Sequence, residues 1–297
     1  MGAMRAPSNG IEIEYETFGE DSDPPLLLVM GLGAQMVAWD TELCEGLVDR
    51  GFYVIRFDNR DVGLSTKVDV GELDVLTEVM KGLSGGEPTA PYLLSDMAAD
   101  AVGLLDALGI DRAHIVGASM GGMIVQAIAI AHPERVLSMT SIMSTTGDPD
   151  VGAPNPEVLP LLLQPAPAER DAYIANAVEA GRLLGSPEHF DEVRAAEKAG
   201  LSYDHCFYRA GVGHQLLAIT ASGSRSDALR HLDINTLVIH GDVDPLVNVS
   251  GGERTAEVIP GAELLIFEGM GHDLPSYYWP QVIEAITALA SRSSASA

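Results

Sequence analysis

The amino-acid sequence predicts an α/β protein with a mostly parallel β-sheet and helices on both faces of that sheet. Three observations support this prediction. Short runs of consecutive apolar residues recur along the chain, as in strands that are buried on both faces. Segments with apolar residues at helical spacing lie between these runs, which is the alternation of α/β folds. The chain has 297 residues and is 46% hydrophobic, enough for one large α/β domain or for a core with an inserted subdomain.

Seven segments have the pattern of β-strands. Residues 10–18 alternate apolar and acidic side chains, which is typical of a half-exposed strand. The others are continuous apolar runs, expected to be buried on both faces, at residues 26–30, 53–57, 113–117, 137–143, 236–240 and 263–267. Together they supply the strands of the predicted sheet.

Four segments have apolar residues at helical spacing. They lie at residues 39–48, 94–108, 120–131 and 278–290. The third is dense in Ala, Ile and Val and ends at a His-Pro pair, as helices often do. Most of residues 66–95 show no such period, and we expect an irregular region there.

Between residues 144 and 228 the alternation of strands and helices stops. Near its start lies GDPDVGAPNPEVLP, rich in Pro and Gly, and three helical segments follow without a strong strand. No period repeats, so a solenoid is excluded. The sequence therefore predicts a core of residues 1–143 and 229–297, with residues 144–228 as a mostly helical insertion.

The charge balance argues against two classes of partner. The chain has 17 Lys and Arg against 43 Asp and Glu, a formal net charge of −26. Because nucleic acids and anionic lipids are bound through Lys and Arg, neither is an expected partner. No apolar run is long enough for a membrane span and no signal-peptide pattern is present, so we expect a cytoplasmic protein. Cys44 and Cys206 are far apart and lack metal-site spacing, so we expect neither a disulfide framework nor a bound metal.

The segment GASMG, residues 117–121, places a lone serine, Ser119, between glycines at the end of an apolar run. Gly and Ser are common turn formers, so a simple turn is one interpretation. The pattern G-x-S-x-G after a strand and before a helix is also typical of a strained turn that exposes a nucleophilic serine. Its glycines allow close backbone approach, and the N-terminus of the following helix favours developing negative charge. With this context we favour the nucleophile.

A serine hydroxyl needs a general base, and the base needs an orienting carboxylate. In this architecture the chain order is Ser, then Asp or Glu, then His, each after a strand. The run at 236–240 precedes Asp242 and Asp244, and the run at 263–267 precedes His272. We favour Asp244, because a residue at the strand end itself, as Asp242 is, is more often a turn former. Of the eight histidines, only His272 follows a late strand in a glycine-rich loop.

A tetrahedral intermediate also needs donors for its negatively charged oxygen. The backbone N–H after the nucleophile, that of Met120, is the first expected donor. The second comes from the loop after the first buried strand, MGLG at residues 30–33, and we assign it to Leu32. The loop DNRDVGLS at residues 58–65 also follows a strand, but its charge pairs and glycine favour a salt-bridged, structural role.

These pieces make the chain resemble the α/β-hydrolase superfamily over essentially its whole length. The marks, in the family's order, are MGLG, DNRDVGLS, GASMGG, HGDVDPLV and GMGH. Within the superfamily, LLLVMG, FDNRDVGLST and IPGAELLIFEGMGHDLP are similar to methylesterases of the aclacinomycin type and related actinobacterial carboxylesterases. The resemblance implies an eight-stranded, mostly parallel sheet, a helical cap formed by the insertion, and the triad Ser119, Asp244 and His272. The chain departs from many relatives at Met30, where they have His, and at Asp61, where they have Gly.

The expected reaction is hydrolysis of a small-molecule carboxylic ester through an acyl-enzyme, which needs neither a cofactor nor a metal. The expected substrates are uncharged esters with short, medium or bulky hydrophobic groups. Leucines at 161–163, 183–184 and 216–217 could line an apolar pocket, although packing beneath the cap is the simpler expectation. C–C bond hydrolysis, perhydrolysis and acyl transfer use the same triad, and a ligand receptor with slow hydrolysis is an alternative from another class. The oligomeric state and the natural substrate stay open.

Overall fold

The computed structural model describes residues 4–71, 73–158, 160–161 and 166–294. Within these residues lies one eight-stranded sheet with the order β1-β2-β4-β3-β5-β6-β7-β8. In chain order the strands are β1 (Met4–Ser8), β2 (Ile11–Phe18), β3 (Pro25–Val29), β4 (Tyr53–Phe57), β5 (Ala113–Ala118), β6 (Val136–Ile142), β7 (Thr236–Gly241) and β8 (Glu263–Phe267). The pairs β1–β2 and β2–β4 are antiparallel and the other pairs are parallel. The predicted eight-stranded, mostly parallel sheet is therefore confirmed.

Strand β1, at one edge of the sheet, was not among the segments predicted from pattern. It pairs with β2, so that Met4 lies opposite Tyr15 and Ser8 opposite Ile11. Its proline, Pro7, is tolerated because an edge strand has one row of unpaired backbone groups. The short strand with Pro in it carries little sequence signal, which explains why it was missed.

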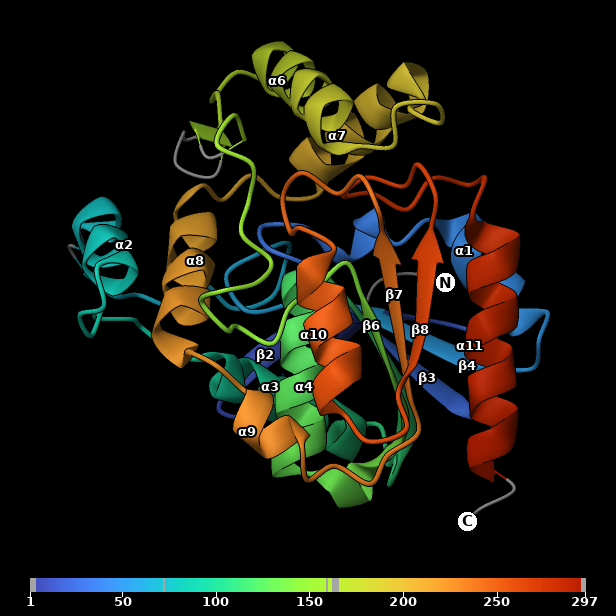
Figure 1. The fold of residues 1–297 in the computed structure, drawn as a ribbon. Coiled ribbons are helices and arrows are strands. Elements are labelled where there is room, and N and C mark those ends of the chain that lie inside the picture. Colours follow the sequence, from blue (N-terminus) through green and yellow to red (C-terminus); the bar gives the residue numbers. More distant parts are fainter. Residues whose placement is uncertain (1–3, 72, 159, 162–165, 295–297) are drawn as a thin grey trace.

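Helices cover both faces of the sheet (Figure 1). Those of the core are η1 (Met36–Ala38), α1 (Thr41–Val48), α2 (Val75–Leu83), α3 (Leu94–Ala107), α4 (Met120–Ala131), η2 (Pro133–Arg135), α10 (Ser250–Val258) and α11 (Trp279–Ser294). Successive residues of β3 point to opposite faces. Leu26 and Leu28 pack with buried residues of α1 and α11, whereas Leu27 and Val29 pack with those of α3 and α4. Two apolar layers therefore hold the sheet in place from either side.

The predicted insertion contributes helices between β6 and β7. They are α6 (Arg170–Leu184), α7 (Glu192–His205), α8 (Ala210–Ser222) and α9 (Ser226–Leu229). Helices α6 and α7 pack on each other and lie across the carboxyl ends of the strands, at the top of Figure 1. The predicted boundary at residue 228 falls inside α9, and the division into core and cap stays a prediction. In the parts of the chain that the structure describes, no helix has the length and hydropathy needed to cross a bilayer.

The expectation of an irregular region over residues 66–95 is wrong in part, because helix α2 lies there. The Asp74 side chain caps this helix by accepting the Thr77 backbone N–H at 3.1 Å. Helix α2 packs against α8 of the insertion, with Val79 buried, while Leu76 and Met80 stay exposed. The local pattern of this helix was present and was missed: Asp74 is a typical N-cap residue, and the apolar residues Val75 and Val79 are spaced by four.

Candidate active site

Ser119 lies at the turn between strand β5 and helix α4, at φ 55° and ψ −120°. Non-glycine residues rarely adopt this conformation, and it marks backbone strain. The turn is too tight for a side chain on either glycine. A Cβ on Gly117 would lie 2.1 Å from the carbonyl oxygen of Gly121, and one on Gly121 would lie 2.0 Å from that of Val29. The glycines therefore allow the turn to pack against β3 while Ser119 projects beyond the strand end.

Three polar residues that follow different strands form one hydrogen-bonded row. His272 Nε2 lies 3.0 Å from Ser119 Oγ, and His272 Nδ1 lies 2.7 Å from Asp244 Oδ2. Because the strands are parallel, their carboxyl ends bring these side chains to the same edge of the sheet. Asp242 instead accepts the backbone N–H of Gly269 at 2.7 Å in the adjoining turn. The structure thus brings together Ser119, Asp244 and His272 and leaves Asp242 outside the row.

The surroundings of Asp244 keep its carboxylate charged. The side chain is buried, and its Oδ1 accepts the backbone N–H groups of Leu246 and Val247, both at 2.9 Å. The buried His240 places its Nε2 3.4 Å from Asp244 Oδ2. Burial raises the pKa of Asp244, but His272, His240 and Val247 outweigh that effect and lower the pKa to about 2. The anion favours a proton on His272 Nδ1, which leaves Nε2 able to accept another.

The loop after β3 passes directly over the serine turn. A Cβ on Gly31 would lie 3.0 Å from Ser119 Cβ, and the next residue, Leu32, lines the same cavity as Ser119. Among the described residues, the backbone N–H groups of Leu32 and Met120 have no hydrogen-bond acceptor. Both are therefore available to an oxygen atom beside Ser119. Their assignment as oxyanion donors stays a prediction.

The structure accounts for both departures from the family pattern. At Met30 the loop is held through its backbone, because the Met30 carbonyl accepts Asn59 Nδ2 at 2.9 Å. Asp61 has φ 69°, in the left-handed region that favours glycine, so a glycine would fit this position without strain. Its buried carboxylate accepts the Tyr92 hydroxyl at 2.7 Å and lies 3.0 Å from His214 Nδ1. These contacts agree with the structural role expected for the 58–65 loop.

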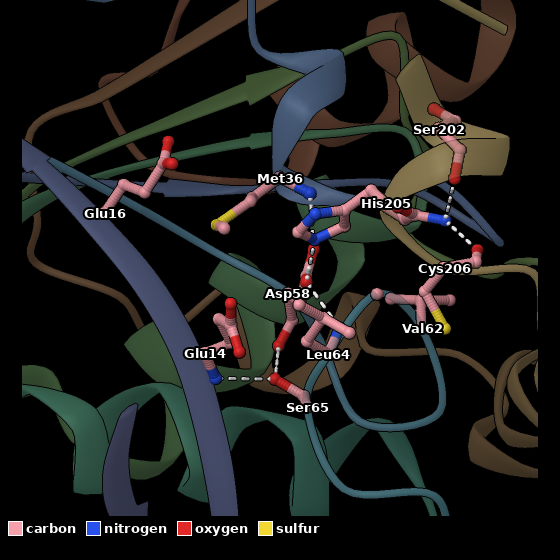
Figure 2. Close-up of polar contacts among 12 residues, drawn as sticks. Glu14, Glu16, Met36, Asp58, Val62, Leu64, Ser65, Ser202, His205 and Cys206 are labelled. Atoms are coloured by element: carbon pink, nitrogen blue, oxygen red, sulfur yellow. Dashed lines mark hydrogen bonds and ion pairs between the residues drawn. The ribbon is translucent and has the colours of Figure 1, made fainter. Parts of the chain in front are cut away.

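Asp58 joins this loop to both η1 and the insertion (Figure 2). Its side chain is fully buried, and it accepts the backbone N–H of Met36 at 2.7 Å and that of Leu64 at 2.8 Å. His205, at the end of α7, places Nε2 2.9 Å from the same carboxylate. The hydrogen bond to Asp58 raises the pKa of His205, although burial opposes the shift. One buried carboxylate thus joins η1, the 58–65 loop and the end of α7.

Residues 24–276 match the sequence model of the alpha/beta hydrolase fold family. The chain belongs to this family. The expected family resemblance, and with it the fold, is therefore confirmed.

Two curated relatives show which alpha/beta hydrolases the chain is similar to. It is 30% identical to rhodomycin D methylesterase of Streptomyces peucetius, over 97% of this chain and 98% of the relative. It is 28% identical to 2-hydroxymuconate semialdehyde hydrolase of Pseudomonas sp. (strain CF600), over 95% of this chain and 93% of the relative. Among solved structures, the meta-cleavage product hydrolase of Pseudomonas fluorescens IP01 superposes with a TM-score of 0.75 at 20% identity, covering 97% of each chain. The similarity to this solved structure concerns the fold alone.

A cavity of about 450 Å³ lies between the core of this alpha/beta hydrolase and its insertion. Ser119, His272 and Leu32 line it from the core, and Leu161 and Leu184 line it from the insertion. A second cavity of about 570 Å³ shares Leu161 with the first and is lined in part by Tyr173, Phe207, Tyr208 and Leu216. Two of the predicted leucine segments therefore contribute to the cavity beside Ser119.

The remaining leucines of the prediction have other surroundings. Leu217 on α8 is fully buried, whereas Leu183 is 43% exposed. Leu162 and Leu163 lie outside the described residues. Within the described residues, no group of three or more His, Cys, Asp or Glu side chains could hold a metal ion.

Sequence reasoning missed the residues that support the row of three. His240 was assigned only to a strand, yet it contacts Asp244 and donates from Nε2 to the Val247 carbonyl at 2.7 Å. A signal was present, since a buried histidine four residues before the acid can reach it across the strand end. Asp58 and His205 carry no such signal, because they are 147 residues apart in the chain.

Proposed function

We propose that the protein is a serine carboxylic ester hydrolase that acts through an acyl-enzyme. The observation that supports this most is the row formed by Ser119, His272 and Asp244 at the wall of a cavity between core and insertion. A hydroxyl, an imidazole and a carboxylate at these distances are the minimal apparatus for nucleophilic acyl transfer. The similarity to rhodomycin D methylesterase supports an ester as the substrate.

In the first step His272 Nε2 accepts the proton of Ser119 as Oγ attacks the ester carbonyl carbon. The carbonyl π electrons move to oxygen, and the resulting oxyanion is stabilised by the N–H groups of Leu32 and Met120. The tetrahedral intermediate collapses by breaking the bond to the alcohol oxygen, which takes the proton from His272. The products are a free alcohol and an ester on Ser119. Asp244 stabilises the imidazolium that forms on the way.

In the second step water takes the place of the alcohol. His272 Nε2 removes a proton from the water as its oxygen attacks the acyl carbon. The second oxyanion uses the same two amides, and its collapse returns the proton to Ser119 Oγ and releases the carboxylic acid. The strained backbone at Ser119 helps to keep Oγ exposed during both steps.

The substrate that we propose is an uncharged ester with hydrophobic groups. The cavity beside Ser119 is lined largely by apolar side chains, among them Leu32, Leu43, Met143 and Leu161. The chain's net charge of −26 disfavours the approach of anions. A neutral ester should therefore be hydrolysed with a higher kcat/KM than an anionic ester of the same length.

The decisive test is covalent labelling of Ser119 by a fluorophosphonate, followed by turnover of p-nitrophenyl esters. Ser119→Ala should abolish both labelling and turnover. The matched control is Ser138→Ala, because Ser138 Oγ also lies close to an imidazole, 2.8 Å from His114 Nδ1, but inside the core. Ser138→Ala should label normally. Persistent labelling of Ser119→Ala, or release of one p-nitrophenol per protein with no second cycle, would contradict the proposal.

C–C bond hydrolysis is the second candidate. It is favoured by the similarity to 2-hydroxymuconate semialdehyde hydrolase over most of both chains. The same base and amides would serve a ketone in place of an ester. Comparing kcat/KM for a dienoate ketone with that for p-nitrophenyl esters separates the two, because an esterase should prefer the esters by orders of magnitude.

A further inference from the structure

The end of helix α6, in the insertion, is bonded to the loop that carries His272. The His272 backbone N–H donates to the Leu184 carbonyl at 2.7 Å. The Gly271 N–H donates to Ser186 Oγ at 3.1 Å, and Ser186 Oγ in turn donates to Asp273 Oδ1 at 2.6 Å. We call this set of contacts the histidine clasp. It holds the residue before His272, His272 itself and the residue after it.

The two segments of the clasp meet at van der Waals distance with no room for side chains. A Cβ on Gly271 would lie 2.5 Å from the Leu184 carbonyl oxygen, and one on Gly185 would lie 2.7 Å from Asp273 Oδ2. Ser186 is fully buried. A contact that is this close and buried leaves little room for α6 and the histidine loop to shift relative to each other.

Ser186 is the centre of the clasp because it satisfies two partners at once. Its hydroxyl accepts from Gly271 and donates to Asp273, and its backbone N–H also donates to Asp273 Oδ1 at 3.0 Å. Removing the hydroxyl would leave the Gly271 N–H without its acceptor and take one of two donors from the Asp273 carboxylate. The loop could then move, and His272 would move with it.

We propose that Ser186 is a positioning residue through which the insertion holds His272 at hydrogen-bond distance from Ser119. The insertion then has two functions: it walls the cavity, and it completes the geometry of the base. This inference rests on the proposed function, since it concerns the same hydroxyl and imidazole. A displacement of about 1 Å in a reacting group can reduce a rate by about 10²-fold.

The test compares Ser186→Ala with Ser226→Ala. Ser226 is a matched control, because it is also a buried serine whose Oγ donates to an aspartate, Asp148, at 2.6 Å, but it is remote from the cavity. Both variants should lower the melting temperature by similar amounts. Only Ser186→Ala should lower kcat, by about 10- to 100-fold, with KM nearly unchanged and with slower fluorophosphonate labelling.

A double-mutant cycle tests the clasp without depending on one variant. Asp273→Ala removes the other side of the same contact, so Ser186→Ala and Asp273→Ala should be non-additive in kcat, whereas Ser226→Ala and Asp273→Ala should be additive. If Ser186→Ala does not fold, Asp273→Ala alone must show the loss of kcat. A kcat for either clasp variant within about threefold of wild type, or a loss confined to KM, would overturn the inference. Failure of the wild type itself to label at Ser119 would refute the proposed function instead.

Discussion

Asp242 and Asp244 are two residues apart, and their side chains make different contacts. Asp242 bonds to the turn after β8 through Gly269, whereas Asp244 bonds to His272 Nδ1. The difference arises from the distance of each residue from the end of β7. Asp242 comes directly after the strand and lies in the turn, whereas Asp244 is two residues further on and reaches His272. The pair therefore offers an internal comparison of a structural and a proposed catalytic carboxylate.

We expect Asp244→Asn to lower kcat by about 10³- to 10⁴-fold, because an amide cannot stabilise the imidazolium and favours the wrong tautomer of His272. Asp242→Asn should change kcat by less than about threefold. Both variants should be measured with a p-nitrophenyl ester, together with their melting temperatures. If the two variants lost activity equally, the assignment of Asp244 as the orienting acid would be wrong.

Between elements, the contact of helix α4 with strand β3 decides the shape of the serine turn. It depends on Gly121, whose Cα faces the Val29 carbonyl with no room for a Cβ. Backbone cannot move aside as a flexible side chain can, so a methyl group there must push the turn away from β3. The loop at residues 30–33 follows β3 directly and would lose its position over Ser119.

We expect Gly121→Ala to lower the free energy of unfolding by about 3 kcal/mol or more and to abolish fluorophosphonate labelling. Gly109→Ala is the control. Gly109 has φ 71°, but no atom lies within 4 Å of the position that its added methyl carbon would take. That change should cost about 1 to 2 kcal/mol and leave labelling intact. Urea unfolding and labelling rates check both variants. Equal effects of the two substitutions would contradict the inference that the close approach to β3 is what requires glycine at position 121.

Elements with a strong local pattern were predictable from the sequence. The buried strands of the sheet are continuous apolar runs, and helix α4 was predicted with its observed bounds, Met120–Ala131. Strand β1 and helices α2 and α10 were not predicted. Strand β1 contains Pro7, and α10 has the helix-disfavouring Gly251 and Gly252 in its first turn, so the local signal of both is weak. Helix α2 differs, because its apolar residues do lie at helical spacing after Asp74 and were overlooked.

In the candidate site too, the residues with a local sequence signal were predictable and the others were not. Ser119, Asp244 and His272 could be named because each lies in a short motif after a strand. Their supports could not, since Ser186 meets Asp273 across 87 residues of chain and Asp58 meets His205 across 147. Hydrogen bonds between side chains this far apart leave no periodicity in the sequence, so only the fold reveals them.

In the whole molecule, polar contacts attach the insertion to the core around the cavity. Arg194 and Lys198 of α7 both pair with Asp40, at 2.7 and 2.8 Å, and His205 at the end of α7 pairs with Asp58 at 2.9 Å. Exposed ion pairs contribute little to stability, but the two carboxylates here are largely buried. Among these three ion pairs, only the pair of His205 with Asp58 contains a side chain, the histidine, that titrates near neutral pH.

The attachment through His205 should weaken as pH rises. Since the folded-state pKa of His205 is raised above 6.5 by Asp58, with Glu14 and Glu16 adding to the effect, folding favours the protonated ring. The contribution of the protonated His205 ring to the stability of the fold is complete below pH 6.5. It is lost as the pH rises through the raised pKa of the folded state. We expect His205→Gln to lower the free energy of unfolding by about 1 kcal/mol at about pH 6 and by clearly less at about pH 9, measured by urea unfolding.

The control for this prediction is His132→Gln, because His132 lies 3.8 Å from Glu134 in an exposed pair on the surface. That variant should change stability by less than about 0.5 kcal/mol at either pH. If His205→Gln had the same cost at the acidic and the alkaline pH, the contact would depend on the shape of the ring and not on its charge. A pH-dependent loss would instead mean that the position of the end of α7 on the core responds to protonation of a single histidine, and with it the residues just after α7, Cys206 to Arg209, that line the second cavity.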